Sequence, residues 1–263
     1  YEMRIEAIIW GQVFALLLML LAIPLLDRGR LICGKYDHAI LKRILSYGIP
    51  LVPAAVAMCL ITVSDRYMLT WLITDTKRGI TEVAYYSFAF KFVSLLALIS
   101  AGFSNFWGVY VFDTYQKEGA RNKFCSYFKY YILAMFVMSL LVLSFLPWVF
   151  QWFEEFRPGI LVVPIAMAGF VVYQVGDYFC IGIAIKEKTK IRAIAGLLTA
   201  IVNIMLNFTL IPAYGGVGAI TASFISYLVY CGILMQQSNK LFPIPYPLWV
   251  WITSVALILG AFF

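Results

Sequence analysis

Charged residues are scarce in this sequence: they make up 13% of its 263 residues, whereas 63% are hydrophobic. A soluble core cannot enclose so much apolar surface, so the composition predicts a polytopic membrane protein. We also expect no cleavable signal peptide, because the first apolar stretch has neither a positive n-region nor a small-residue cleavage site. Since the chain begins and ends at apolar stretches, we expect a fragment of a longer protein, truncated at both ends.

Several kinds of functional site are missing as well. The cysteines are scattered without a CxxC motif and His38 is the only histidine, so neither a disulfide framework nor a metal site is expected. The Gly215-Gly216 run lacks the GK[ST] of a nucleotide loop. All loops are short and leave no room for a soluble catalytic domain. We therefore expect no enzyme, no catalytic residues and no cofactor.

The apolar stretches predict an all-α fold, a polytopic membrane helix bundle of about eight transmembrane helices. A helix needs about 20 apolar residues to cross a bilayer. The expected spans are residues 6–26, 47–73, 83–112, 127–150, 160–185, 191–212, 217–236 and 246–263.

The basic residues are distributed unevenly between the loops on the two sides of these spans. Fourteen of the 20 lie on one side, four lie on the other, and Arg66 and Lys91 lie within spans. The positive-inside rule makes the first side cytoplasmic, so the second span runs from inside to outside. Loop location also explains the net charge of +7, and no nucleic-acid partner is expected.

An Asp65–Arg66 pair lies well inside the second span. An ionised side chain at bilayer depth costs roughly 2.5–3.5 kcal/mol on insertion scales. The pair either locks two helices together or lines a transport path, and Thr62 lies one turn before it. Lys91 in the third span has a similar depth, about 12 Å below the outer surface at 1.5 Å per residue. We expect Asp65, Arg66 and Lys91 to meet across an antiparallel helix pair and, with one net positive charge, to attract an anion.

The third span carries small and polar residues on one side. Ser87, Lys91, Ser94 and Asn105 share this stripe at helical spacing. We expect the stripe to face protein or water, and the opposite side, which is rich in Phe and Leu, to face lipid.

Two further spans carry polar residues. The fifth contains Tyr173, Gln174 and Asp177. A membrane carboxylate without an adjacent base suits proton or cation coupling; the alternative is a neutral Asp that bonds a neighbouring helix. In the sixth span Asn203 and Asn207 are one turn apart, and they either hold helices together or line a polar cavity.

A proline and three glycines follow the sixth span. Pro212 is expected to end that helix. Gly215, Gly216 and Gly218 are expected to form a tight turn that lets the seventh span begin at once.

Three stretches together resemble the Wzx-type polysaccharide flippases of the MOP superfamily, which also contains MurJ-like lipid II flippases and MATE exporters. They are LKRILSYGIPLVPAAV followed by SDRYML within Leu41–Leu69, AYYSFAFKF at Ala84–Phe92, and NIMLNFTLIPAYGGVGAITASFISYLVY at Asn203–Tyr230. The resemblance covers nearly the whole chain. Each motif alone is weak, and their combination is fairly specific.

The resemblance implies two lobes of six helices around a central cavity. Residues 1–45 would then be the last helix of the first lobe with a basic cytoplasmic linker, 46–236 the six-helix C-terminal lobe, and 237–263 a connector with the start of an additional helix. The implied function is to flip undecaprenyl-pyrophosphate-linked oligosaccharides across the bacterial inner membrane by alternating access, driven by a cation gradient. Other glycan-assembly membrane proteins are possible partners.

Residue roles follow from this resemblance as hypotheses. Arg66 and Lys91 would bind the pyrophosphate, Asp65 would hold them in place, and Asp177 would couple the ion. The remaining polar residues would line or orient the cavity: Thr62, Ser87, Ser94, Asn105, Tyr173, Gln174, Asn203 and Asn207.

Three other functions remain open at this point. A MATE-like exporter of small molecules differs in the ligand that its cavity holds. A membrane enzyme such as a glycan polymerase would need a large outer loop or a catalytic His/Asp/Glu set near the interface, and the sequence has neither. A scaffold of a glycan-assembly complex would transport nothing.

Overall fold

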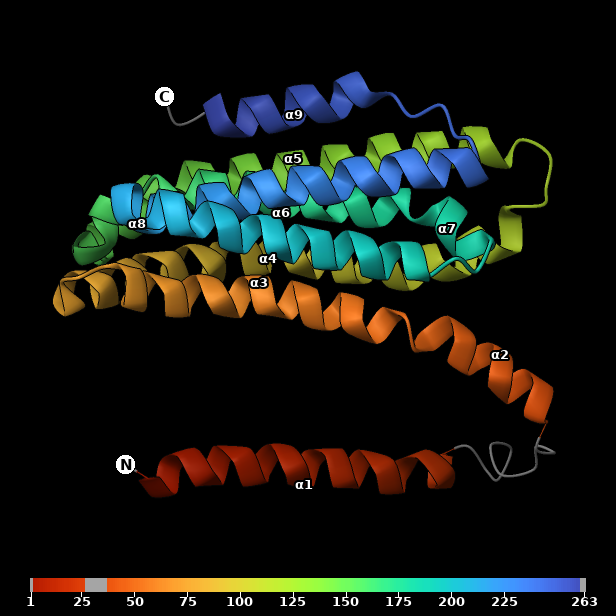
Figure 1. Ribbon diagram of the computed structural model, residues 1–263, viewed down its shortest axis with the longest axis horizontal. Coiled ribbons are helices and arrows are strands. Elements are labelled where there is room, and N and C mark those ends of the chain that lie inside the picture. Colours follow the sequence, from red (N-terminus) through yellow and green to blue (C-terminus); the bar gives the residue numbers. More distant parts are fainter. Residues whose placement is uncertain (1, 27–36, 261–263) are drawn as a thin grey trace. The chain divides into compact units, whose positions relative to one another are not determined.

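The computed structural model describes residues 2–26 and 37–260 (Figure 1). All regular structure in these residues is helical and no strand occurs among them, which confirms the predicted all-α class. By internal contacts the chain divides into two units, Tyr1–Leu45 and Ser46–Phe263, and each is described separately.

The first unit contains α1 (Glu2–Leu26) and most of α2 (His38–Gly48). The Asp37 carboxylate accepts the backbone N–H of Ala39 at 2.8 Å, which caps the start of α2. Residues 27–36 of the predicted basic loop lie outside the described residues.

The second unit contains the remaining helices. They are α3 (Leu51–Leu72), α4 (Thr76–Thr114), α5 (Ala120–Trp152), the 3-10 helix η2 (Glu154–Gly159), α6 (Val162–Phe179), α7 (Ile181–Ile185), α8 (Lys190–Leu241) and α9 (Leu248–Gly260). α4 begins before the predicted residue 83 because Asp75 caps it: its carboxylate accepts the backbone N–H of Lys77 at 3.0 Å.

Five helices are long and apolar enough to cross a membrane, which indicates a multi-pass membrane protein. They are His38–Leu72 (α2 with α3), α4, α5, Val162–Ile185 (α6 with α7) and α8. α8 contains both the sixth and the seventh predicted span, and α1 and α9 coincide with the first and the last. The total of eight crossings stays a prediction.

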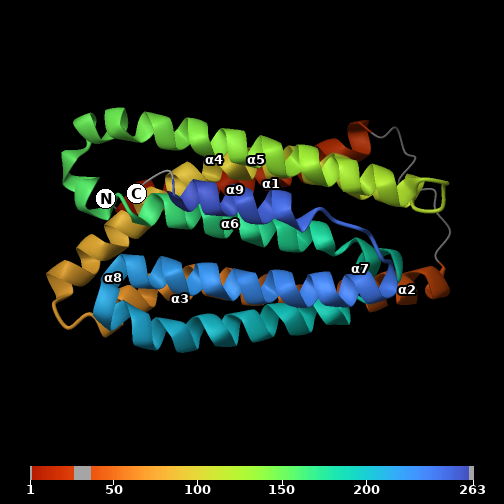
Figure 2. The ribbon, with the colours of Figure 1, turned by 90° about the horizontal axis from the view of Figure 1, so that it is seen from above.

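α6 is the central helix of the second unit. It packs against α4, α5, α8 and α9, and 67% of its most apolar stretch is buried, more than in the other four long helices. The two halves of α8 lie side by side next to α3 (Figure 2). α3 and α6 therefore pack on the same long, folded-back helix.

The burial of the two sides of α4 differs from the prediction. Phe88, Val93 and Leu96, on the apolar side, are buried in the core against α5 and α6, so the prediction that this side faces lipid is wrong. The reason is that α4 needs its large side chains to fill the space between these helices. The stripe with Lys91 is the exposed side of α4.

α8 reverses direction at Gly215 rather than at Pro212. Pro212 lies inside the helix, so the prediction that it ends the helix is wrong. Gly215 has φ 58° and ψ −131°, a left-handed conformation that glycine adopts without strain. The first half of α8 is therefore residues 190–214, and the second half is residues 216–241.

Close contacts at this reversal explain the other two glycines. The Glu82 carboxylate accepts the Gly216 N–H at 2.8 Å, and a Cβ on Gly216 would lie 2.9 Å from it. A Cβ on Gly218 would overlap the carbonyl oxygen of Leu210. The predicted tight turn is confirmed, and its glycines let the two halves of α8 approach each other.

Gly218→Ala should therefore destabilise the protein, because the added methyl group overlaps backbone that cannot move aside. Overpacking of this kind costs about 1–3 kcal/mol. Gly232→Ala is the matched control in the same helix, since nothing lies within 4 Å of its added Cβ. The measurement is thermal unfolding in detergent. Equal melting temperatures for the two variants would contradict the packing described here.

Candidate functional site

Asp65 is fully buried in α3, and its carboxylate accepts three hydrogen bonds from neutral side chains. Oδ2 accepts the Tyr86 hydroxyl at 2.7 Å and the Ser223 hydroxyl at 2.6 Å. Oδ1 accepts the Asn207 amide at 2.6 Å. The donors come from α4 and from both halves of α8, so this one carboxylate joins four helical segments.

Asn203 completes a polar cluster around Asp65. Its Nδ2 donates to Ser223 Oγ at 3.0 Å, and its Oδ1 accepts Asn207 Nδ2 at 3.2 Å. Oδ1 of Asn207 is buried and has no hydrogen-bond partner among the described residues. We call Asp65, Tyr86, Asn203, Asn207 and Ser223 the Asp65 cluster.

The Asp65 cluster lacks a cation. The hydrogen bonds that the Asp65 carboxylate accepts all come from neutral side chains, whereas Asp177 pairs with Arg192 at 2.8 Å. Burial of a carboxylate away from water is costly unless hydrogen bonds or an opposite charge compensate it. Neutral donors alone provide that compensation here.

Arg66 and Lys91 do not pair with Asp65. Both side chains are exposed, so the prediction that Asp65 holds these two cations in place is wrong. The physical reason is helix geometry: neighbouring residues point about 100° apart around a helix with 3.6 residues per turn. Asp65 points into the bundle, and Arg66 points out of it.

The other predicted residues of α3 and α4 occupy different environments. Thr62 is half-buried and donates to a backbone carbonyl one turn earlier at 3.1 Å. Ser87 is half-buried, whereas Ser94 and Asn105 are exposed. Ser87, Lys91, Ser94 and Asn105 form a polar stripe along one side of α4.

Asp177 has a basic partner, contrary to the premise on which it was selected. Arg192 Nη2 donates to Asp177 Oδ1 at 2.8 Å, and the Tyr230 hydroxyl donates to the same oxygen at 3.1 Å. The side chains of Asp177 and Arg192 are 29% and 34% exposed. A partly exposed ion pair is a different environment from that of Asp65.

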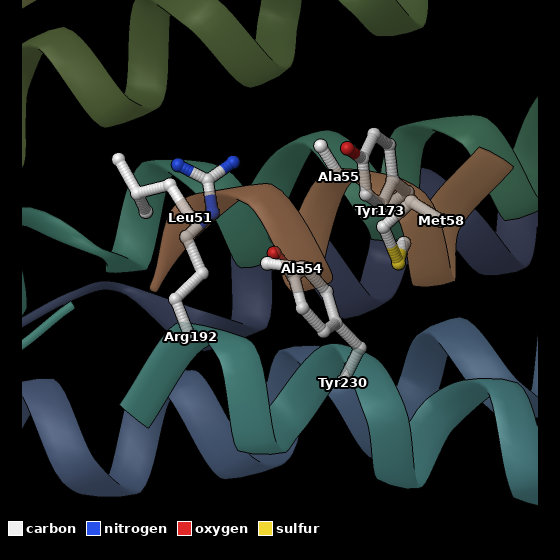
Figure 3. A pocket seen from close by; sticks show the side chains of 7 residues that line it. All are labelled: Leu51, Ala54, Ala55, Met58, Tyr173, Arg192 and Tyr230. Atoms are coloured by element: carbon white, nitrogen blue, oxygen red, sulfur yellow. The ribbon is translucent and has the colours of Figure 1, made fainter. Parts of the chain in front are cut away.

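A cavity of about 340 Å³ opens beside this ion pair (Figure 3). We call it the Arg192 cavity. Leu51, Ala54, Ala55 and Met58 of α3 form its apolar lining, and the polar lining residues are Tyr173, Arg192 and Tyr230.

A smaller cavity of about 140 Å³ also borders Asp177. Its aromatic lining includes Trp107 and Tyr178, whose rings stack 4.6 Å apart. Gln174 lies here too and donates to the Tyr131 hydroxyl at 3.3 Å. The predicted polar run of α6 is therefore divided between two cavities.

Apolar packing separates the Arg192 cavity from the Asp65 cluster. Met58, the cavity residue nearest to Asp65 in sequence, lies about 10 Å from it along α3 at 1.5 Å per residue. Ile61, between them, forms a buried contact with Ala57 and with Ala200 of α8. The second unit thus holds two polar sites at different depths.

Sequence reasoning missed four residues of these sites. Tyr86 and Ser223 lie within the motifs at Ala84–Phe92 and Asn203–Tyr230, but nothing in those motifs distinguishes them from their neighbours. Arg192 and Tyr230 carried a weak signal: Arg192 belongs to the basic stretch that ends the loop before α8, and Tyr230 ends the motif at Asn203–Tyr230.

No group of three His, Cys, Asp or Glu side chains that could hold a metal ion occurs in the part of the chain that the structure describes. No family model, no curated protein and no solved structure matches this chain.

Tyr86→Phe should destabilise the protein by about 1–3 kcal/mol, because it removes a hydrogen bond to a buried carboxylate and leaves the oxygen underpaired. Tyr67→Phe is the control, since Tyr67 is 72% exposed. Unfolding of both variants in mixed detergent micelles measures the difference. An unchanged midpoint for Tyr86→Phe would mean that the hydroxyl does not support Asp65.

Proposed function

We propose that this chain is part of a transporter that moves an undecaprenyl-pyrophosphate-linked oligosaccharide from the cytoplasmic to the periplasmic leaflet of the bacterial inner membrane by alternating access. The Asp65 cluster is the main support. It holds a fully buried carboxylate, with no cationic partner among the described residues, in a helix apolar enough to cross a membrane. Ionisable groups at such positions are expensive and mark ion or substrate pathways by default.

We assign the coupling step to Asp65 rather than to Asp177, because Arg192 already compensates Asp177. A proton or a sodium ion on the Asp65 carboxylate would neutralise its charge and so weaken the three hydrogen bonds that it accepts. The unpaired Asn207 oxygen offers an additional ligand, since hard cations prefer oxygen. Binding would therefore change how α3, α4 and the two halves of α8 are held together.

That change provides a route to alternating access. A ligand shifts a conformational equilibrium only through its different affinity for the two states. If the donors from the two halves of α8 separate in one state, the cation binds more tightly to that state. The driving gradient then favours one orientation of the transporter over the other.

Two observations support the proposed substrate class: the resemblance to the Wzx-type flippases and two exposed cations. Arg66 and Lys91 are exposed side chains on helices that are apolar enough to cross a membrane. Arginine and lysine bind phosphate groups through charge-assisted hydrogen bonds. The hydroxyl and amide groups of Ser94 and Asn105 on the same side of α4 can bond sugars.

Two other functions compete with this proposal. A MATE-like exporter of small molecules would use the same coupling carboxylate, and it differs in not requiring a pyrophosphate-linked lipid. A scaffold of a glycan-assembly complex would retain wild-type glycan export after every polar cavity residue is substituted.

Asp65→Asn in the full-length protein should reduce gradient-driven glycan-lipid transport at least about tenfold, because a neutral amide cannot exchange a driving cation. Asp113→Asn is the control, since Asp113 is an exposed carboxylate of α4. Transport into proteoliposomes with and without a proton or sodium gradient is the measurement. Wild-type gradient dependence in Asp65→Asn, at a normal membrane level, would remove Asp65 from the coupling step.

Arg66→Ala and Lys91→Ala should each raise the substrate concentration needed for half-maximal transport, with a larger effect in the double variant. Lys77→Ala, an exposed cation in the first turn of α4, is the control. Half-maximal concentrations equal to wild type in all three variants would exclude Arg66 and Lys91 as pyrophosphate ligands.

A further inference from the structure

The Arg192 cavity has the composition of an anion-binding site. Its lining contains one cation, Arg192, and two tyrosines that carry hydroxyl donors, Tyr173 and Tyr230; α3 contributes only apolar side chains to it. A volume of about 340 Å³ lies within the range of small-molecule sites, about 300–1,000 Å³. Figure 3 shows the Arg192 guanidinium reaching across from α8 to the level of Leu51.

Arg192 has donors to spare. Its contact with Asp177 is a single Nη2–Oδ1 hydrogen bond rather than a bidentate pair. A guanidinium has five N–H donors in a planar fork that matches phosphate oxygens, and its side chain here is 34% exposed. An anion in the cavity can therefore bind Arg192 without first removing it from its place in α8.

Asp177 limits that binding. The empty pair is neutral, so an arriving anion meets the repulsion of the Asp177 carboxylate as well as the attraction of Arg192. The Tyr230 hydroxyl also donates to Asp177, which gives the carboxylate a second partner when Arg192 turns towards an anion. Asp177 thus positions Arg192 and also lowers its affinity for anions.

The surroundings favour anions as well. The loop between α7 and α8 exposes Lys186 and Lys188, and Lys190 is exposed at the start of α8. Lys188 and Lys190 lie within four residues of Arg192 in sequence, and basic groups near a site raise the local concentration of anions and speed their arrival. The charge distribution assigns this end of the unit to the cytoplasmic side, where a lipid-linked substrate begins its passage.

We propose that the Arg192 cavity binds the pyrophosphate group of a lipid, with Arg192 as the binding residue and Asp177 as the group that sets its affinity. The lipid part of this inference rests on the proposed function; the anion site itself does not. The α3 residues that line the cavity are about 12 to 22 Å from Arg66 along the helix at 1.5 Å per residue, so the two cations would hold the pyrophosphate one after the other.

The test is binding to the purified full-length protein in phosphatidylcholine nanodiscs. The probes are inorganic pyrophosphate, farnesyl pyrophosphate and, as the uncharged control, farnesol. The variants are Arg192→Gln, Arg192→Lys and Asp177→Asn. Arg78→Gln is the control variant, since Arg78 is an arginine that is also paired with a carboxylate, Glu82, and does not line the cavity.

Wild-type protein should bind both pyrophosphates, and the farnesyl compound more tightly. Arg192→Gln should weaken binding at least tenfold, Arg192→Lys should be intermediate, and Arg78→Gln should match wild type. Asp177→Asn should bind at least fivefold more tightly, because the competing charge is gone. A gain in affinity cannot result from misfolding, so this variant keeps the test decisive if Arg192→Gln is unstable.

Two results would overturn the proposal. Equal affinities in wild type and Arg192→Lys with weaker binding in Asp177→Asn would make the ion pair purely structural. Equal affinities of wild type for inorganic and farnesyl pyrophosphate would overturn the lipid part and assign the site to a free anion. Loss of binding in Arg192→Gln together with normal transport in Asp65→Asn would retain the anion site and reject the coupling proposal.

Discussion

The structure depends on one constraint: a carboxylate inside a membrane helix must be fully hydrogen-bonded by the helices around it. Asp65 meets this constraint with three neutral donors at 2.6–2.7 Å. Two of them, Asn207 and Ser223, come from opposite halves of α8, each eight residues from Gly215. The reversal at Gly215 therefore brings both donors to the same level, about 12 Å from the turn.

The rest of the second unit follows from that arrangement. The halves of α8 can lie this close only because the turn consists of glycines, and Glu82 satisfies the N–H of Gly216 where the second half begins. Small residues let α3 pack closely on α8, and this packing places Asp65 between the donors from the two halves of α8. Loss of the glycine turn, of the packing between α3 and α8 or of one donor would leave the Asp65 carboxylate short of a hydrogen-bond partner. The free-energy cost of a missing partner is largest in a low-dielectric interior.

Asp65 and Asp177 show how neighbouring helices give two carboxylates different chemistry. Asp65 is 0% exposed and its hydrogen-bond partners are neutral side chains. Asp177 is 29% exposed and is paired with the Arg192 guanidinium. Apolar packing around Ile61 lies between the two sites.

Much of this fold was predictable from the sequence, and the pairing of side chains was not. Apolar stretches of membrane length identified the helices, and the glycine run identified the reversal in α8. Asp65 and the two asparagines were recognisable because polar residues are rare in such stretches. Their partners were not, because a tyrosine or serine is common in such motifs and nothing distinguishes Tyr86 and Ser223 from their neighbours. Asp65 and Arg66 are adjacent in sequence, yet their side chains point about 100° apart on the helix.

The most direct test is infrared difference spectroscopy of the full-length protein in lipid, recorded as protons or sodium ions are added. The account predicts a change in the carboxyl stretching region of the wild-type spectrum that is missing from the spectrum of Asp65→Asn and retained in that of Asp177→Asn. Identical difference spectra for wild type and Asp65→Asn would contradict the claim that the buried carboxylate at position 65 binds the driving ion.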